Sequence, residues 1–177
     1  MILTVAGLWN SGPQHWQSVW EAAHPAWKRV PHRDWDTPAR EEWVDEFEAA
    51  VAACPEPPVL VAHSLGCVLV AHWASLARHS PIRGAFLVAP SDVAAASYPR
   101  GPTDFSPIPL TPLPFPSLLV TSTDDHYVTL ERATAFAAAW HSELVVAGKA
   151  GHFNGASGHG PWPEGLARLE GFLARIP

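Results

Sequence analysis

Short apolar runs alternate with longer amphipathic stretches along the chain. The short runs fall at 2–6, 59–62, 85–89, 118–121 and 144–147, with a weaker one at 27–30. Continuous apolar runs of this length are typical of strands buried on both faces, and strands that alternate with helices favour a parallel sheet. We therefore predict an α/β fold of the Rossmann-like three-layer type, with about six parallel strands and helices on both faces.

Four of the intervening stretches have the helical period. They cover residues 38–53, 65–78, 129–141 and 164–175. In the first of them, Trp43, Phe47 and Val51 share one face, and Thr37 followed by Pro38 predicts the N-terminus, with the threonine as N-cap. The stretch 65–78 is apolar on most of its surface, so this helix should be nearly buried.

Composition and charge exclude several classes of protein. The chain has 177 residues, of which 47% are hydrophobic and 16% charged, which is typical of one folded domain spanning 1–177 and not of a disordered chain. Its net charge is −6 and its basic residues are not clustered, which argues against nucleic-acid binding. No apolar run approaches the length of a membrane span, and the residues before Gly7 are too few for a signal peptide. With only two cysteines, we expect a cytoplasmic protein with reduced thiols.

Prolines are concentrated between the strands at 85–89 and 118–121. The segment 99–116 is the richest in the chain. We interpret it as a stiff, extended connection that could form a wall of the site. The alternative is a docking site for a partner that recognises proline.

The segment Ala62–Gly66 has the features of a nucleophile elbow. An apolar strand at 59–61 runs into Ala-His-Ser-Leu-Gly, and a helix follows at once. In this context a serine sits on a tight turn with its Oγ exposed, and small residues two positions away allow the turn to pack. Gly66 meets that demand, and Ala62 replaces the more usual glycine. The alternative is that Ser64 merely caps the helix.

A serine nucleophile needs a base and a carboxylate that orients the base. His152 follows the strand at 144–147, and Asp124 and Asp125 follow the strand at 118–121. Loops that follow parallel strands gather at one edge of the sheet, so three such loops can converge on Ser64. The order Ser, Asp, His is that of α/β-hydrolases. The spacing leaves both aspartates possible, and the alternative for His152 is a loop histidine bonded to the backbone.

Five segments together resemble the small α/β-hydrolases related to retinoblastoma-binding protein nine, including short bacterial serine hydrolases. The resemblance covers nearly the whole chain and implies a compact α/β-hydrolase fold without a large cap domain. It also implies Asp125 as the acid, because the acid of this family lies three residues before an apolar residue, here Val128. The matching segments are 7–16, 62–66, 122–125, 151–154 and, for the bacterial branch, 157–165.

Analogy with α/β-hydrolases also implies the oxyanion hole and the walls of the pocket. One N–H should come from Leu65, after the nucleophile, and one from the loop after the first strand, where we choose Leu8 over Trp9. We expect a shallow, open pocket that prefers short acyl groups. Its substrate-binding residues should be Trp9, Phe153 and Trp162.

Four further residues have structural interpretations. We expect His15 to pack beneath the first loop, with a place in the pocket wall as the alternative. His63 should support the turn, His72 should be a satisfied core histidine, and Cys67 should be a buried, inert thiol.

These observations predict a serine hydrolase that cleaves small esters, with amides or thioesters as further substrates. The alternative is a hydrolase fold used to bind a protein or peptide. His and Cys residues do not occur at a recognised metal-ligand spacing, so we predict neither metal nor cofactor. The expected partner is a small-molecule substrate, and a protein partner is left open.

Overall fold

A computed structural model of the chain describes residues 1–76, 80–99 and 104–177. Within these residues, six parallel strands form one sheet in the order β2-β1-β3-β4-β5-β6. The α/β fold with six parallel strands is thus confirmed. The strands are β1 (Ile2–Val5), β2 (Lys28–Arg29), β3 (Val59–His63), β4 (Gly84–Val88), β5 (Ser117–Thr121) and β6 (Glu143–Val146).

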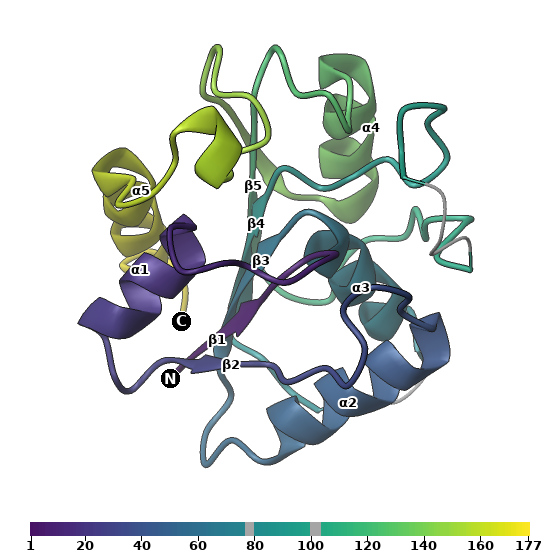
Figure 1. Cartoon of the computed structure of the whole chain (residues 1–177). Helices are drawn as coiled ribbons and strands as arrows, with labels where there is room; N and C mark the ends of the chain where they lie inside the picture. The colour runs from purple at the N-terminus through teal and green to yellow at the C-terminus, as the bar shows by residue number, and fades with distance from the viewer. Residues whose placement is uncertain (77–79, 100–103) are drawn as a thin grey trace.

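Helices cover both faces of this sheet, as Figure 1 shows. The first and last helices lie on one face, and the other three lie on the opposite face. The helices are α1 (Trp16–Ala23), α2 (Arg40–Ala52), α3 (Leu65–Ala74), α4 (Leu130–Trp140) and α5 (Pro163–Leu173), with a short 3₁₀ turn, η1 (Gly155–Ser157). Helix α3 ends at Ala74 with Ser75 as its C-cap, so its predicted continuation through residues 75 and 76 is wrong, and the rest of that prediction lies at 77–78, outside the described residues.

The core consists of two apolar layers, one on each face of the sheet. Strands β3, β4 and β5 are buried along their whole length, as their continuous apolar runs predicted. Trp43 and Phe47 of α2 and Trp73 of α3 are fully buried in one layer. Trp16 and Trp20 of α1 are buried in the other. Large indole rings therefore pack between the helices and the sheet in both layers.

The start of α2 differs from the prediction. Its N-cap is Ala39, which makes no capping bond with its side chain. The hydroxyl of Thr37 instead donates to Asp34 Oδ2 at 2.6 Å, and the carboxylate of Asp104 accepts the N–H of Arg40 at 2.8 Å. The predicted Thr37 cap is therefore wrong, because an acidic side chain 64 residues away in the sequence satisfies the first turn.

The described part of the proline-rich segment is tied to two helices. The ring of Phe105 is fully buried, and its carbonyl accepts a hydrogen bond from His72 Nε2 at 2.8 Å. The carbonyl of Pro109 accepts from Trp140 Nε1 at 2.8 Å. These contacts confirm His72 as a satisfied core histidine and anchor the connection between β4 and β5.

Candidate active site

Ser64 lies between β3 and α3, in a backbone conformation that few residues adopt. Its φ is 57° and its ψ is −125°, a region that is costly for a residue with a Cβ. Two glycines permit the close packing of this turn. A Cβ on Gly66 would lie 2.4 Å from the carbonyl oxygen of Val5, and one on Gly7 would lie 2.8 Å from Ser64 Cβ. The small-residue requirement read from Gly66 thus reflects contact with the end of β1.

The side chains of Ser64, His152 and Asp125 form one chain of hydrogen bonds. His152 Nε2 lies 2.9 Å from Ser64 Oγ, and His152 Nδ1 lies 2.8 Å from Asp125 Oδ2 and 3.0 Å from Oδ1. The carboxylate of Asp125 is completely shielded from solvent, and the His152 side chain is 8% exposed. A carboxylate accepts only, so Nδ1 carries the proton, and Nε2 of the neutral ring faces the serine as an acceptor.

The two neighbouring aspartates have different partners. Asp125 Oδ1 also accepts the backbone N–H of Tyr127 at 2.8 Å, which fixes its orientation toward the imidazole. Asp124 points to the backbone of the histidine loop instead, where its Oδ1 accepts the N–H groups of Ala150 and Gly151 at 2.9 and 2.8 Å. These hydrogen bonds, with that to Gly151 first, lower the pKa of Asp124. Asp124 therefore supports the loop, while Asp125 contacts the imidazole.

Two further histidines stand beside His152. His63 donates from Nε2 to the carbonyl oxygen of His152 at 2.8 Å, so this contact braces the loop that carries His152, whereas the sequence interpretation expected His63 to support its own turn. His15 accepts the N–H of Gln17 at Nδ1 as the N-cap of α1 and packs edge-on against His63. Burial lowers the pKa of His63 well below 6.5, and burial followed by the charge of Arg29 lowers that of His15 to about 3. Both rings are therefore neutral near pH 7.

A cavity of about 160 Å³ opens over Ser64. Of the described residues, those that line it carry no Asp, Glu, Lys or Arg side chain. His15 belongs to this wall, which is the alternative interpretation of that residue, and it also caps α1, a role that the sequence did not predict. The lining consists of Leu8, Trp9, Asn10, His15, His63, Ser64, Ser91, Tyr98, Pro99, Tyr127, His152 and Asn154.

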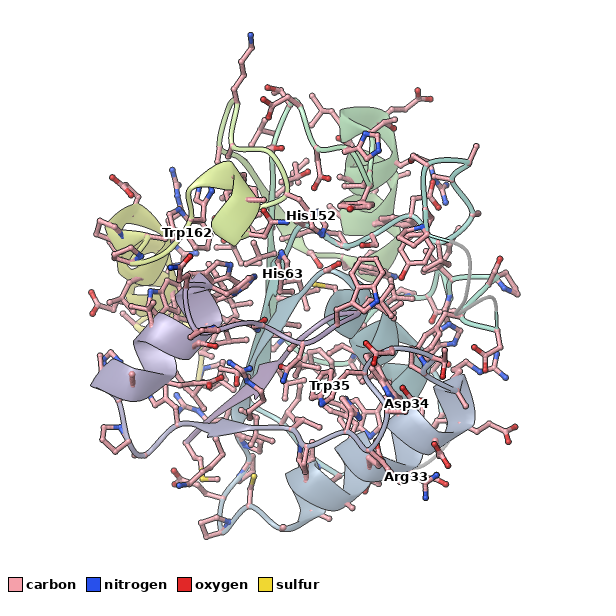
Figure 2. The ribbon with its side chains drawn as sticks, viewed as in Figure 1. Arg33, Asp34, Trp35, His63, His152 and Trp162 are labelled. Carbon is pink, nitrogen blue, oxygen red and sulfur yellow. The ribbon has the colours of Figure 1, made fainter. Side chains whose placement is uncertain are left out.

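The three expected substrate-binding aromatics are placed differently. Trp9 is on the cavity wall and is 57% exposed. Phe153 is fully buried, and Trp162 stacks on Trp20 with ring centroids 5.7 Å apart. Figure 2 shows His63 and His152 together and Trp162 off toward α1 and α5. The expectation that Phe153 and Trp162 line the pocket is corrected here, because both rings pack into the apolar layer under α1 and α5.

The two N–H groups expected to form an oxyanion hole lie at this edge of the sheet. Leu65 is the first residue of α3, where a helical N–H lacks a partner within the helix. Leu8 lies on the cavity wall, and no hydrogen bond from its N–H is found among the described residues. A Cβ on Gly7 would come within 3.1 Å of Leu65 N, so the two loops pack closely.

A hydroxyl that contacts Ser64 was missed by the sequence reasoning. Ser91 is 1% exposed, and its Oγ lies 2.8 Å from the Oγ of Ser64. It follows β4, which pairs with β3, so its loop belongs to the same sheet edge. The available signal was a polar Ser-Asp pair that follows the apolar run at 85–89 after one proline.

A parallel sheet that carries a serine on such an elbow, with no large insertion, defines a compact α/β-hydrolase. The family described as "Serine hydrolase" matches residues 2–171. The chain therefore belongs to the serine hydrolase family. Comparison with curated protein sequences gives no match.

Solved structures agree with this assignment. A protein from Pectobacterium atrosepticum, described as a candidate YdeN-like hydrolase, is 34% identical with a TM-score of 0.88, over 97% of this chain and 89% of that chain. The ydeN gene product of B. subtilis is 19% identical with a TM-score of 0.79, over 98% of each chain. Esterase 2 of Thermogutta terrifontis is 18% identical with a TM-score of 0.70, over 98% of this chain and 82% of that chain. The last two share the fold.

Two features are absent from the described part of the chain. None of its helices combines the length and the apolar character that a membrane crossing requires. Over the same residues, His, Cys, Asp and Glu side chains do not gather in groups of three or more that could hold a metal ion. Cys67 is fully buried, and burial raises the pKa of its thiol, which keeps it protonated and unreactive.

Proposed function

We propose that the protein is a serine esterase that cleaves small, uncharged esters through an acyl-enzyme on Ser64. The observation that carries this proposal is the unbroken chain of hydrogen bonds from Asp125 through His152 to Ser64 Oγ, at the base of a cavity. Membership of the serine hydrolase family supports the reaction class.

In the acylation step, His152 Nε2 takes the proton of Ser64 as Oγ bonds to the ester carbonyl carbon. The N–H groups of Leu65 and Leu8 stabilise the resulting oxyanion. The bond to the leaving alcohol then breaks, and the imidazolium of His152 returns the proton to that alcohol. Asp125 stays ionised and holds the ring in the required tautomer.

The cavity supports a short, neutral acyl group as the favoured substrate. Its volume of about 160 Å³ is small, and the neutral rings of His15 and His63 offer no charge to a charged substrate. We expect nitrophenyl acetate and propionate to be cleaved with higher kcat/KM than nitrophenyl decanoate. A maximum at decanoate would contradict the proposed substrate class.

The proposal is tested first by the Ser64→Ala variant. Removal of the nucleophile should lower kcat by about 10⁴-fold or more, since triad members act as a unit. A fluorophosphonate probe should label the wild-type chain at Ser64 and should not label the variant. The matched control is Ser117→Ala, a buried hydroxyl at the start of β5, which should keep both activity and labelling.

Two outcomes would contradict the proposal. Full esterase activity in Ser64→Ala would exclude Ser64 as nucleophile. Absence of labelling and turnover in the folded wild-type chain would instead favour the hydrolase fold as a binding module.

A further inference from the structure

Ser91 supplies a second hydroxyl to the nucleophile, outside the triad. Its Oγ lies 2.8 Å from Ser64 Oγ, a normal O–H···O separation, and its side chain is buried against the cavity. Ser64 Oγ thus has two partners, His152 Nε2 at 2.9 Å and Ser91 Oγ.

Proton counting fixes the direction of this second hydrogen bond. Neutral His152 has its proton on Nδ1, which faces the carboxylate of Asp125, so Nε2 must receive the proton of Ser64. A serine hydroxyl has a single proton, and Ser64 already donates its proton to His152 Nε2. Ser91 must then be the donor and Ser64 Oγ the acceptor in the hydrogen bond between the two serines.

The loop that carries Ser91 is held on both sides. Ala89, two residues earlier, has a φ of 49°, a costly conformation for a residue with a Cβ, and its N–H donates to Val120 O. Asp92, the next residue, pairs with Arg132 of α4 at 2.8 Å and donates its N–H to Tyr127 O at 3.0 Å. Such strain persists where the surrounding structure imposes it, and it is frequent in active sites.

We propose that Ser91 is a catalytic residue that speeds deacylation by donating its hydroxyl to Ser64 Oγ as this oxygen leaves the acyl group. The inference rests on the proposed acyl-enzyme at Ser64. In this step His152 Nε2 takes a proton from water, and the water oxygen bonds to the acyl carbon. The bond from that carbon to Ser64 Oγ then breaks, Oγ keeps the electron pair, and it receives the proton held by His152. Ser91 keeps its own proton throughout.

The hydrogen bond from Ser91 affects the two halves of the reaction unequally. In the acyl-enzyme, Ser64 Oγ is an ester oxygen and a weak acceptor, and it becomes a strong acceptor as negative charge develops on it. Only an interaction that strengthens on the way to the transition state lowers a barrier. In the free enzyme the same bond is already formed to the hydroxyl oxygen of Ser64, so acylation gains little from it.

The test measures acylation and deacylation separately in the Ser91→Ala variant with nitrophenyl acetate. We expect kcat to fall about tenfold, the effect of one hydrogen bond to a developing charge, with KM falling in parallel and kcat/KM kept. A burst of one equivalent of nitrophenolate should precede the slow steady state. Intact mass spectrometry should find the acetylated chain, and fluorophosphonate labelling should keep the wild-type rate.

Three further variants keep the test decisive. Ser91→Cys preserves the size of the side chain with a weaker donor, and it should give the same pattern even if the alanine variant folds poorly. Ser117→Ala removes a hydroxyl from another serine pair, in which Ser117 Oγ lies 2.7 Å from Ser142 Oγ, and it should leave all rates unchanged. Ser64→Ala, measured alongside, tests the proposed function itself.

The outcomes distinguish the proposed acyl-enzyme at Ser64 from the proposed role of Ser91 in deacylation. If Ser64→Ala is inactive but Ser91→Ala and Ser91→Cys keep wild-type kcat, only the role of Ser91 is wrong. If kcat and kcat/KM fall equally without an acetylated species, Ser91 orients the nucleophile before acylation, and the deacylation role is overturned. If Ser64→Ala remains active, the acyl-enzyme at Ser64 is wrong and the role of Ser91 falls with it.

Discussion

The two ends of the sheet differ in backbone strain. Of the seven non-glycine residues with positive φ among the described residues, six lie in the loops that follow strands. The exception is His141, which ends α4 and precedes β6. The six are Trp9, Asn10, Ser64, Ala89, Phe153 and Trp162. Strain of this kind is therefore concentrated at the edge that holds the proposed active site. Strained backbone is common in active sites, where it holds side chains in the positions that the reaction requires.

Serine pairs repeat this contrast. Ser64 and Ser91 lie 2.8 Å apart at the carboxyl ends of β3 and β4, and Ser117 and Ser142 lie 2.7 Å apart at the amino ends of β5 and β6. The contacts are nearly identical in length. In the first pair, the imidazole of His152 lies within hydrogen-bond distance of the Ser64 hydroxyl, and the second pair has no such neighbour among the described residues. A base beside the hydroxyl, and not the serine pair alone, is what makes the proposed reaction possible.

The largest expected effect concerns the adjacent aspartates at the active edge. Asp125→Asn should lower kcat by about 10⁴-fold, because the imidazole loses its required tautomer. Asp124→Asn should cost about tenfold or less, since an amide oxygen can still accept the N–H groups of Ala150 and Gly151. Steady-state kinetics with nitrophenyl acetate measures both. The reverse ranking would reassign the acid to Asp124.

The next effect is a loss of stability in acid that comes from the same edge. The folded pKa of His15 is about 3, against 6.5 for an unperturbed histidine, and His63 is shifted in the same direction. Below pH 6.5 the unfolded chain therefore binds protons that the folded chain does not, and the free energy of unfolding falls with falling pH. Above pH 6.5 both histidines are neutral in the folded and the unfolded chain, so the free energy of unfolding does not change there on their account. At pH 5, His15 alone should account for about 2 kcal/mol.

Urea unfolding of His15→Asn at pH 7 and pH 5 measures the contribution of His15 to this loss of stability. Asparagine keeps the N-cap acceptor but cannot titrate, so the difference between the two pH values should shrink by about 2 kcal/mol. His141→Asn removes an exposed histidine at the other end of the sheet and serves as control. An undiminished difference in His15→Asn would show that His15 does not resist protonation in the folded chain.

The smallest effect tests the strain at the amino end. His141→Gly should raise the free energy of unfolding by about 0.5–1 kcal/mol, because glycine adopts a φ of 56° without a Cβ penalty. Esterase activity should stay unchanged, as this turn is remote from Ser64. Thermal unfolding together with a kinetic assay provides the measurement. A marked loss of activity would mean that the strained residue at the amino end also affects the proposed active site.

The strands and helices were largely predictable, for a reason visible in particular segments. The apolar runs at 59–62, 85–89 and 118–121 became central strands with both faces covered, so local hydrophobicity alone identified them. The start of α2 was missed because Asp104, distant in sequence, caps it. Phe153 was missed as a core residue because a ring that follows a loop histidine at this edge can turn toward either the pocket or the core.

The sequence by itself determined the parallel sheet and the elbow at Ser64, because buried strands and tight turns restrict residue types locally. It also placed His152 and both aspartates on the correct edge, since loops that follow parallel strands meet there. Only the tertiary structure distinguished the contacts of Asp125 from those of Asp124 by geometry, brought Ser91 to Ser64 and moved Trp162 into the core. Those contacts join residues far apart in the chain at hydrogen-bond or ring-packing distance, and no local pattern encodes such distances.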